Sequence, residues 1–154
     1  MSAKFVMDSP IGRLAVHTHA GKLIQIDFAA RGELTRDLVD PLHRQIAHQI
    51  KSYFSRPGMR FNLPLNLGGT PFQRKVWHAL QEIPASQTLS YGELAQHLHT
   101  SARAVGNACR ANPVPLVVPC HRVIAKNGIG GFAGAVTGRR IDRKRWLLQH
   151  EGAL

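Results

Sequence analysis

Two short helices joined by a tight turn are the sequence feature that most limits how this chain can fold. Ser90-Tyr91-Gly92-Glu93 has the pattern of a capping box, in which a serine and a glutamate three residues later each satisfy a backbone N–H of the other. It predicts a short helix that reaches Leu98, followed after His99-Thr100 by a second helix over residues 101–110. This spacing is typical of a helix-turn-helix, whose second helix is laid against DNA.

The helix expected over residues 101–110 has two faces. We expect the face whose residues recur at i, i+3, i+4 and i+7 to be buried, with Gly106 allowing a close approach and Cys109 serving as core: Ala102, Val105, Gly106 and Cys109. The other face carries Arg103, Asn107 and Arg110, and the small neighbours Ala102 and Ala104 favour a close approach to a groove. An ordinary helical hairpin with a solvated polar face is the alternative.

A third helix is expected before this pair. Thr70-Pro71-Phe72-Gln73 is another capping box with proline at the first helical position, and Pro84 marks the end of the helix. The apolar face of this helix is expected to consist of Phe72, Val76, Trp77 and Leu80.

The first 65 residues predict a small scaffold. Residues 13–19 and 22–28 alternate apolar and polar side chains and are joined at Ala20-Gly21, which indicates a hairpin. Asp40-Pro41 predicts the start of a helix that ends at residues 56–58. We expect Ile46, Ile50 and Phe54 on its apolar face, a further strand over residues 60–65, and no metal site among the scattered histidines His17, His19, His43 and His48.

We therefore expect two domains, a mixed α/β scaffold over residues 1–67 and a second domain over residues 68–154. The 20 Lys and Arg against 9 Asp and Glu give a net charge of +11, and eleven bases against four acids after residue 70 favour a polyanion as the partner of the second half. A ribosomal or membrane-surface protein fits this charge as well. Two cysteines and the lack of a long apolar segment predict a cytoplasmic protein, or a nucleoid-associated one in a bacterium.

Cys120 is the best candidate for covalent chemistry. It lies in the run Val117-Val118-Pro119-Cys120-His121-Arg122-Val123-Ile124, directly before an imidazole and a guanidinium. A thiol reacts as its thiolate, and a neighbouring histidine or positive charge lowers the thiol pKa. Taken alone, the pair also fits a buried cysteine in a strand beside a surface histidine.

From Gly69 to Glu151 the chain resembles the O6-alkylguanine-DNA alkyltransferases, also called methylated-DNA–protein-cysteine methyltransferases. The first 65 residues fit that family only in length and coarse pattern. The resemblance implies an α/β fold, with a small ribonuclease H-like domain of sheet and helix followed by a mostly helical domain with a winged helix-turn-helix. The motifs that carry it are Arg103-Ala104-Val105-Gly106, Asn112-Pro113, Pro119-Cys120-His121-Arg122-Val123 and Trp146-Leu147-Leu148-Gln149-His150-Glu151-Gly152.

The resemblance implies direct DNA repair, in which the alkyl group of O6-alkylguanine, and also of O4-alkylthymine, moves irreversibly to Cys120. Water does not release a thioether, so each molecule acts once and needs no metal or organic cofactor. A Glu-His-water-Cys network activates the thiol in the family, which here assigns Glu151 and His121, while Asn112 ties down the turn beneath them. The partner is double-stranded DNA rather than a membrane, bound by a monomer that can assemble side by side on it.

The resemblance also assigns residues to base flipping, because a stacked base cannot present its O6 alkyl group to a thiolate. Arg103 takes the place of the flipped base, and Tyr91 assists the rotation. The pocket is assigned to Tyr91, Val117, Val118, Val123, Phe132 and Ala133, and the DNA contacts to Tyr91, Ala102, Arg103, Ala104, Gly106, Asn107, Arg110 and Lys126.

Some segments depart from many relatives or lie outside these assignments. Phe132-Ala133 and Gly134-Ala135 differ from the usual residues, and residues 136–141 form a longer connection, which bears on the preference among alkyl groups. The basic cluster from Arg139 to Arg145 is expected to pack behind the active site.

Two other classes of function are open. A non-catalytic winged-helix DNA binder has no use for Cys120 in its run of site residues. A cysteine hydrolase that uses Cys-His-Glu has no use for Arg103 on a recognition helix.

Overall fold

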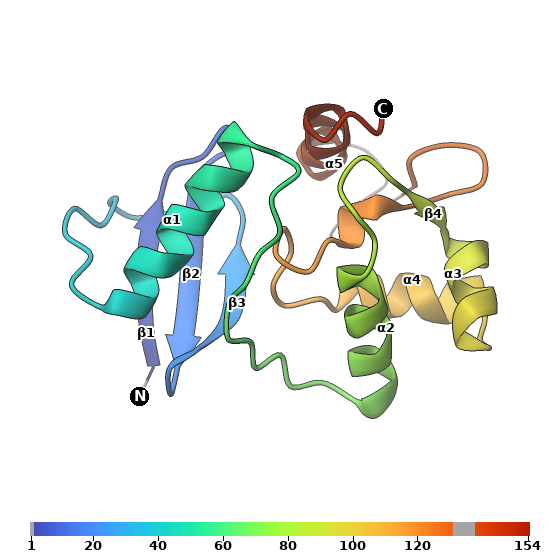
Figure 1. The fold of residues 1–154 in the computed structure, drawn as a ribbon, viewed down its shortest axis with the longest axis horizontal. Coiled ribbons are helices and arrows are strands. Elements are labelled where there is room, and N and C mark those ends of the chain that lie inside the picture. The colour runs from blue at the N-terminus through green and yellow to red at the C-terminus, as the bar shows by residue number, and fades with distance from the viewer. Residues whose placement is uncertain (1, 131–137) are drawn as a thin grey trace. The chain divides into compact units, whose positions relative to one another are not determined.

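The computed structural model describes residues 2–130 and 138–154 (Figure 1). They form two compact units, Met1–Leu67 and Gly68–Leu154, and the expected mixed α/β class is confirmed. Within the described ranges, no helix is long and apolar enough to cross a membrane. In the same ranges, no group of three or more His, Cys, Asp and Glu side chains is arranged to hold a metal ion.

The N-terminal unit is a three-stranded antiparallel sheet with a helix packed on it (Figure 1). The contact includes the rings of Phe5 and His43, whose centroids are 4.9 Å apart, and a 2.9 Å hydrogen bond between Thr18 Oγ1 and His43 Nε2. The sheet has the order β1-β2-β3, and the elements are β1 (Ser2–Met7), β2 (Leu14–His19), β3 (Lys22–Asp27) and α1 (Pro41–Ser55).

The local signals in this unit are confirmed. Ala20 and Gly21 both have positive φ, as the tight hairpin between β2 and β3 requires. Asp40 is the N-cap of α1, and its side chain accepts a hydrogen bond from the Leu42 N–H. The apolar face of α1 differs in one position, because Tyr53 is buried where Phe54 was expected and Phe54 is only half-buried.

Strand β1 was not predicted, and the expected strand over residues 60–65 is wrong. Phe5, Val6 and Met7 are all buried, so β1 lacks the alternation of a strand with one exposed face. Thr35 packs beside this strand and forms two 3.0 Å hydrogen bonds with Val6, from its N–H to the Val6 carbonyl and from the Val6 N–H to its Oγ1. Of residues 60–65, only Leu65 forms a bridge, with Leu23, and the neighbouring Pro64 has no N–H with which to extend a ladder.

The C-terminal unit carries all the candidate site residues and is mostly helical. Two short strands pair in parallel, Leu89 with Val123 and Ser90 with Ile124, and so place the start of one helix beside the end of the Cys120 segment. Its elements are α2 (Pro71–Gln81), β4 (Leu89–Ser90), α3 (Tyr91–Leu98), α4 (Ala102–Arg110), the single 3-10 turn η1 (Cys120–Arg122), β5 (Val123–Ile124) and α5 (Arg139–His150).

Both capping boxes form as expected, at Thr70 with Gln73 and at Ser90 with Glu93. His99 ends α3 in the left-handed conformation, with φ 55° and ψ 50°, and Ser101 then caps α4. Helices α3 and α4 pack against each other (Figure 1). The predicted pair of helices with a tight turn is therefore confirmed.

The buried face of α4 is rotated from the one we expected. Val105 and Cys109 are buried, but Ala108 takes the place of Ala102, which is exposed. The reason is the packing of α2, whose Trp77 indole N–H donates a 2.8 Å hydrogen bond to the Ala108 carbonyl. A methyl group built on Gly106 would meet nothing within 4 Å, so Gly106 makes no close approach within the described part of the chain.

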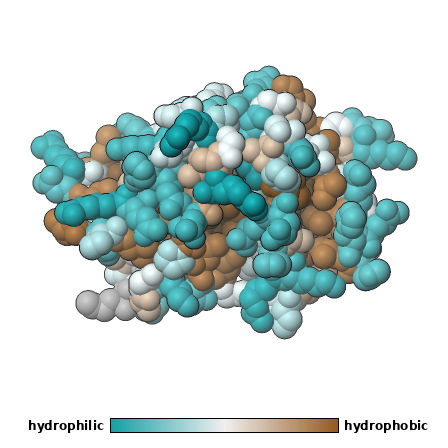
Figure 2. Space-filling view, in the orientation of Figure 1, coloured by the Kyte–Doolittle hydropathy of each residue, from teal (hydrophilic) through white to brown (hydrophobic). Residues whose placement is uncertain are grey.

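Hydrophilic side chains cover much of the face drawn in Figure 2, with apolar residues exposed between them. Among the described residues, the large apolar side chains classed as exposed are Leu34, Val39 and Leu154. Apolar residues exposed singly are ordinary on protein surfaces. They indicate no docking site.

Candidate active site

Cys120 lies in a tight turn, not in a strand. The Cys120 N–H donates to the Val118 carbonyl over 2.9 Å, and the Arg122 N–H donates to the Pro119 carbonyl over 3.0 Å. The side chains of η1 are packed inside the C-terminal unit, with Cys120 7%, His121 0% and Arg122 8% exposed. The turn therefore presents a thiol and an imidazole in a site with little water.

Asn112 fixes the chain just before this turn. Its Nδ2 donates to the Val118 carbonyl over 2.8 Å, and its Oδ1 accepts from the Val114 N–H over 3.0 Å. The same Val118 carbonyl accepts from Cys120, so Asn112 is joined to the nucleophile's own backbone through one shared acceptor. This is the geometry expected of a residue that ties down the turn.

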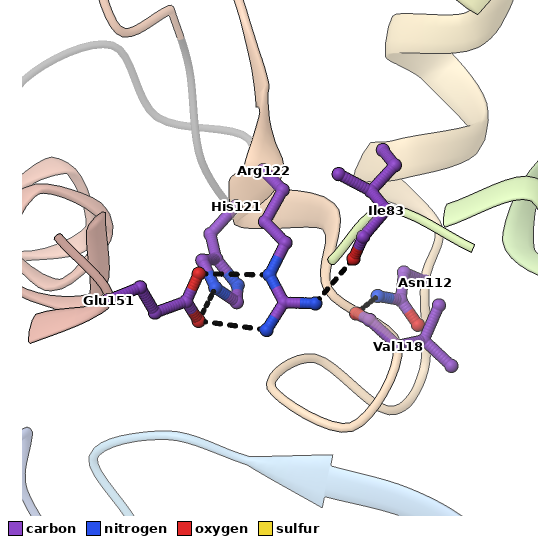
Figure 3. A network of polar contacts seen from close by, with 6 residues as sticks. All are labelled: Ile83, Asn112, Val118, His121, Arg122 and Glu151. Atoms are coloured by element: carbon purple, nitrogen blue, oxygen red, sulfur yellow. Dashed lines mark hydrogen bonds and ion pairs between the residues drawn. The ribbon is translucent and has the colours of Figure 1, made fainter. Parts of the chain in front are cut away.

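Glu151 binds two residues of η1 at once (Figure 3). His121 Nε2 lies 2.7 Å from Glu151 Oε2. Arg122 forms a two-point contact with the same carboxylate, from Nε to Oε1 over 2.9 Å and from Nη2 to Oε2 over 3.0 Å, and its Nη1 donates to the Ile83 carbonyl over 2.6 Å. The Arg122 charge is therefore matched by Glu151, which corrects the expectation that Arg122 acts on the thiol.

The protonation of His121 follows from this arrangement. Burial raises the pKa of Glu151, but hydrogen bonds from His121 and Arg122 overcome that effect and lower its pKa to about 2. Burial lowers the pKa of His121, against the opposing effect of Glu151, so the imidazole is neutral at neutral pH. An ionised carboxylate only accepts hydrogen bonds, and we therefore assign the imidazole proton to Nε2.

The second ring nitrogen of His121 is then the basic one. Nδ1 is buried and has no hydrogen-bond partner among the described residues. A buried imidazole nitrogen with a free lone pair, oriented by a carboxylate on the other side of the ring, is the arrangement of a general base.

The two thiols differ in their surroundings. Burial raises the pKa of Cys120, while the Asn112 side chain and the Lys144 ammonium lower it. Burial raises the pKa of Cys109 to about 12, and Cys109 lies on the buried face of α4, as expected for a core residue. Cys120 therefore rests as a thiol and needs a base to react, and burial keeps Cys109 protonated at neutral pH.

Lys144 is the site residue that sequence reasoning missed. Its side chain is fully buried, and its Nζ donates to the Val123 carbonyl over 2.7 Å and lies 5.7 Å from the centre of the Tyr91 ring. The sequence pattern places it in a basic cluster from Arg139 to Arg145. A signal was present, because residue 144 falls in the apolar stripe of α5 that contains Ile141, Leu147 and Leu148.

The remaining pocket candidates lie close to this turn where the structure describes them. Val117, Val118 and Val123 are buried, and Tyr91 is the first residue of α3, with its pKa raised to about 12 by burial. A methyl group built on Gly130 would lie 3.0 Å from the Tyr91 ring, so the Gly130 backbone lies close to Tyr91. Phe132 and Ala133, and the variant Gly134-Ala135, lie outside the described residues.

Apart from Tyr91, the DNA-contact candidates lie on α4 and just after β5, and most of them are exposed. Ala102, Arg103, Asn107 and Arg110 are exposed on α4, Ala104 and Gly106 are half-buried there, and Lys126 is exposed after β5. The structure thus separates a buried chemical site from an exposed basic helix face within one unit.

Residues 71–153 match the profile of the family described as "6-O-methylguanine DNA methyltransferase, DNA binding domain". A methylated-DNA–protein-cysteine methyltransferase of Shigella flexneri is 47% identical over 113 residues, which cover 71% of this chain and 63% of that protein. The Sulfolobus acidocaldarius protein of the same name is 37% identical over 148 residues, 96% of this chain and 91% of that protein. The chain thus spans less than two thirds of the Shigella protein and nearly all of the Sulfolobus one.

The fold leads to the same group of proteins. The crystal structure of Mycobacterium tuberculosis OGT in complex with DNA superposes with a TM-score of 0.79 at 38% identity. The superposition covers 96% of this chain and 91% of that one.

Proposed function

This chain belongs to the 6-O-methylguanine DNA methyltransferase family, and we therefore propose that it repairs DNA by taking the alkyl group of O6-alkylguanine onto Cys120. O4-alkylthymine is the second proposed substrate, since displacement at that oxygen forms the same thioether. The single observation that carries the proposal is the buried His121–Glu151 pair, whose histidine directly follows Cys120 in the buried turn η1.

The proposed reaction is one displacement. Cys120 Sγ attacks the alkyl carbon, an S–C bond forms, and the C–O6 bond breaks with its electron pair remaining on the base. The thiol proton passes through a bridging water to His121 Nδ1 and finally to the restored guanine, which stays in the DNA, so the reaction balances without a further reactant. Because water does not cleave a thioether, each molecule reacts once.

His121 and Glu151 are proposed to supply the base for this step. The Nε2–H bond to Glu151 orients the ring, and the carboxylate stabilises the imidazolium that forms when Nδ1 takes the proton. A positioned base contributes roughly 10² to 10⁴ in rate. Asn112 is proposed to hold the turn so that Sγ keeps its direction of attack.

The exposed face of α4 is proposed as the recognition face of a winged helix-turn-helix, with β4 and β5 beside α3 as part of the wing. We propose a ribonuclease H-like scaffold for the N-terminal unit. Arg103 would replace the flipped base, Tyr91 would assist its rotation, and Val117, Val118, Val123, Phe132 and Ala133 would line the pocket. Ala102, Ala104, Gly106, Asn107, Arg110 and Lys126 would contact the duplex.

The partner proposed here is duplex DNA, bound by a monomer that can assemble on it. That substrate places the protein in the cytoplasm or at the nucleoid of a bacterium.

A stoichiometry measurement tests the function. Duplex DNA that contains O6-methylguanine is incubated with a limiting amount of the full chain, and the methylated base that remains is quantified. We expect loss of at most one equivalent, no loss with Cys120→Ser, and the same loss as the parent protein with Cys109→Ser, since Cys109 is core. Continued turnover would overturn the proposal, and tight binding without any loss of the methylated base would favour a non-catalytic binder.

A further inference from the structure

Lys144 is a buried cation beside the turn that carries Cys120. The side chain is 0% exposed in the middle of α5, and its Nζ is fixed by the 2.7 Å hydrogen bond to the Val123 carbonyl. The Val123 N–H in turn donates to the Cys120 carbonyl and closes η1. The ammonium is thus attached to the residue that ends the nucleophile's own turn.

Among the described residues, the titratable groups near this ammonium include Cys120, Cys109, Tyr91 and His121, and its charge contributes to the lowered pKa of His121. Burial lowers the pKa of Lys144 to about 8, and the two thiols act against that effect. Lys144 is accordingly a cation at neutral pH, while Cys109 and Tyr91, each with a pKa raised to about 12, are neutral. In the proposed reaction, the Cys120 thiol is the group near Lys144 that becomes an anion.

The two buried cations of the site, Lys144 and Arg122, act on different groups. Arg122 binds Glu151 at two points and so belongs to the carboxylate. Lys144 instead lowers the pKa of Cys120. A charge in a buried site acts more strongly than one in water, because few solvent molecules screen it.

We propose that Lys144 is the buried cation that stabilises the Cys120 thiolate, and so sets the strength of the nucleophile after His121 has removed its proton. In this step the proton leaves Cys120 Sγ and reaches His121 Nδ1 through a bridging water, and Lys144 Nζ keeps its own proton. The importance of Lys144 for alkyl transfer rests on the proposed function. Its effect on the thiol does not.

A purely structural role is the competing explanation, since the bond to Val123 also joins α5 to β5. Two substitutions separate the explanations. Lys144→Met keeps the length and apolar stem of the side chain but removes both the charge and the donor, whereas Lys144→Gln removes the charge and keeps an N–H donor. Arg145→Met is the matched control, because it removes a positive charge from the next, exposed position of α5.

The measurement is an NMR titration of the full chain labelled with ¹³C at the cysteine β-carbon, with Cys109→Ser in all variants to leave one thiol signal. We expect Lys144→Met and Lys144→Gln to raise the apparent pKa of Cys120 by about one unit or more, a tenfold loss of thiolate at a fixed pH, and Arg145→Met to leave it unchanged. Thermal melting verifies that each variant is folded at the pH values used.

Three results would overturn the inference: the same Cys120 titration with and without Lys144, restoration by glutamine, or a parent protein whose Cys120 does not titrate below about pH 10. The titration uses no DNA, so its outcome is independent of the proposed function. A parent protein that shows the Lys144 effect but leaves O6-methylguanine in duplex DNA would refute the function and keep the inference.

Discussion

Replacing Glu151 by glutamine should cost the C-terminal unit about 3 kcal/mol of stability near neutral pH. The carboxylate is completely buried and accepts from His121 once and from Arg122 twice, and glutamine leaves the guanidinium buried without a counter-charge. Removal of one partner of a buried ion pair costs about 3–5 kcal/mol. The fall in the Glu151 pKa from 4.5 to about 2 converts independently to about 3 kcal/mol.

The same shift fixes the pH dependence. Because the pKa of Glu151 is lower in the folded protein than in the unfolded chain, its stabilising effect is fully present above about pH 4.5 and is lost as pH falls through about 2. The difference between the parent protein and Glu151→Gln should therefore be largest near neutral pH and should shrink in acid.

Urea denaturation followed by tryptophan fluorescence measures this difference, since Trp77 and Trp146 both lie in the C-terminal unit. Glu82→Gln is the matched control, because Glu82 is exposed beside Ile83, whose carbonyl binds Arg122. The control should stay within about 0.5 kcal/mol of the parent. A loss below about 1 kcal/mol for Glu151→Gln, or a loss that is the same at about pH 3 and near neutral pH, would refute the reasoning.

Three further predictions concern the proposed reaction. His121→Ala should slow single-turnover transfer by a factor of about 10² or more, with little effect on DNA affinity. Rapid-quench assays at saturating DNA measure this rate, and an unchanged rate would exclude Nδ1 as the base. Arg103→Ala should slow transfer from duplex DNA much more than from free O6-methylguanine, which needs no extrusion, and equal losses on both would make Arg103 a pocket or folding residue. Neutralising Arg110 or Lys126 should lower the slope of log affinity against log salt by about one unit, whereas the pair Arg139 and Arg140 should barely change it; a larger effect of the pair would indicate a second DNA contact.

The parts of the fold that depend on near neighbours could be predicted from the sequence. The capping boxes at Thr70 and Ser90 and the hairpin turn at Ala20-Gly21 each form within a few residues, so their patterns were sufficient. Strand β1 contacts Thr35, which is distant in the sequence, and β1 has no local alternation of apolar and polar residues that would predict a strand. The face of α4 was misplaced because alanines lie on both sides of the helix and only Trp77 decides between them.

Less of the site than of the fold could be predicted from the sequence. The adjacent residues Cys120 and His121 were enough to predict a reactive thiol. The pairing of His121 with Glu151, thirty positions later, could be predicted only from the family resemblance. The contact between Arg122 and Glu151 spans a similar distance, and without it Arg122 looked like an activator of the thiol. The basic residues on both sides of Lys144 suggested an exposed cluster, although its position in the apolar stripe of α5 predicts a buried side chain.

Mapping the transferred methyl group by mass spectrometry tests the central claim most directly. The full chain is incubated with an excess of duplex DNA that contains O6-methylguanine, then measured intact and after digestion. We predict a gain of one methyl group, about 14 Da, on the peptide that contains Cys120 and none on the peptide that contains Cys109. A methyl group on Cys109, or an unmodified protein together with repaired DNA, would contradict the account.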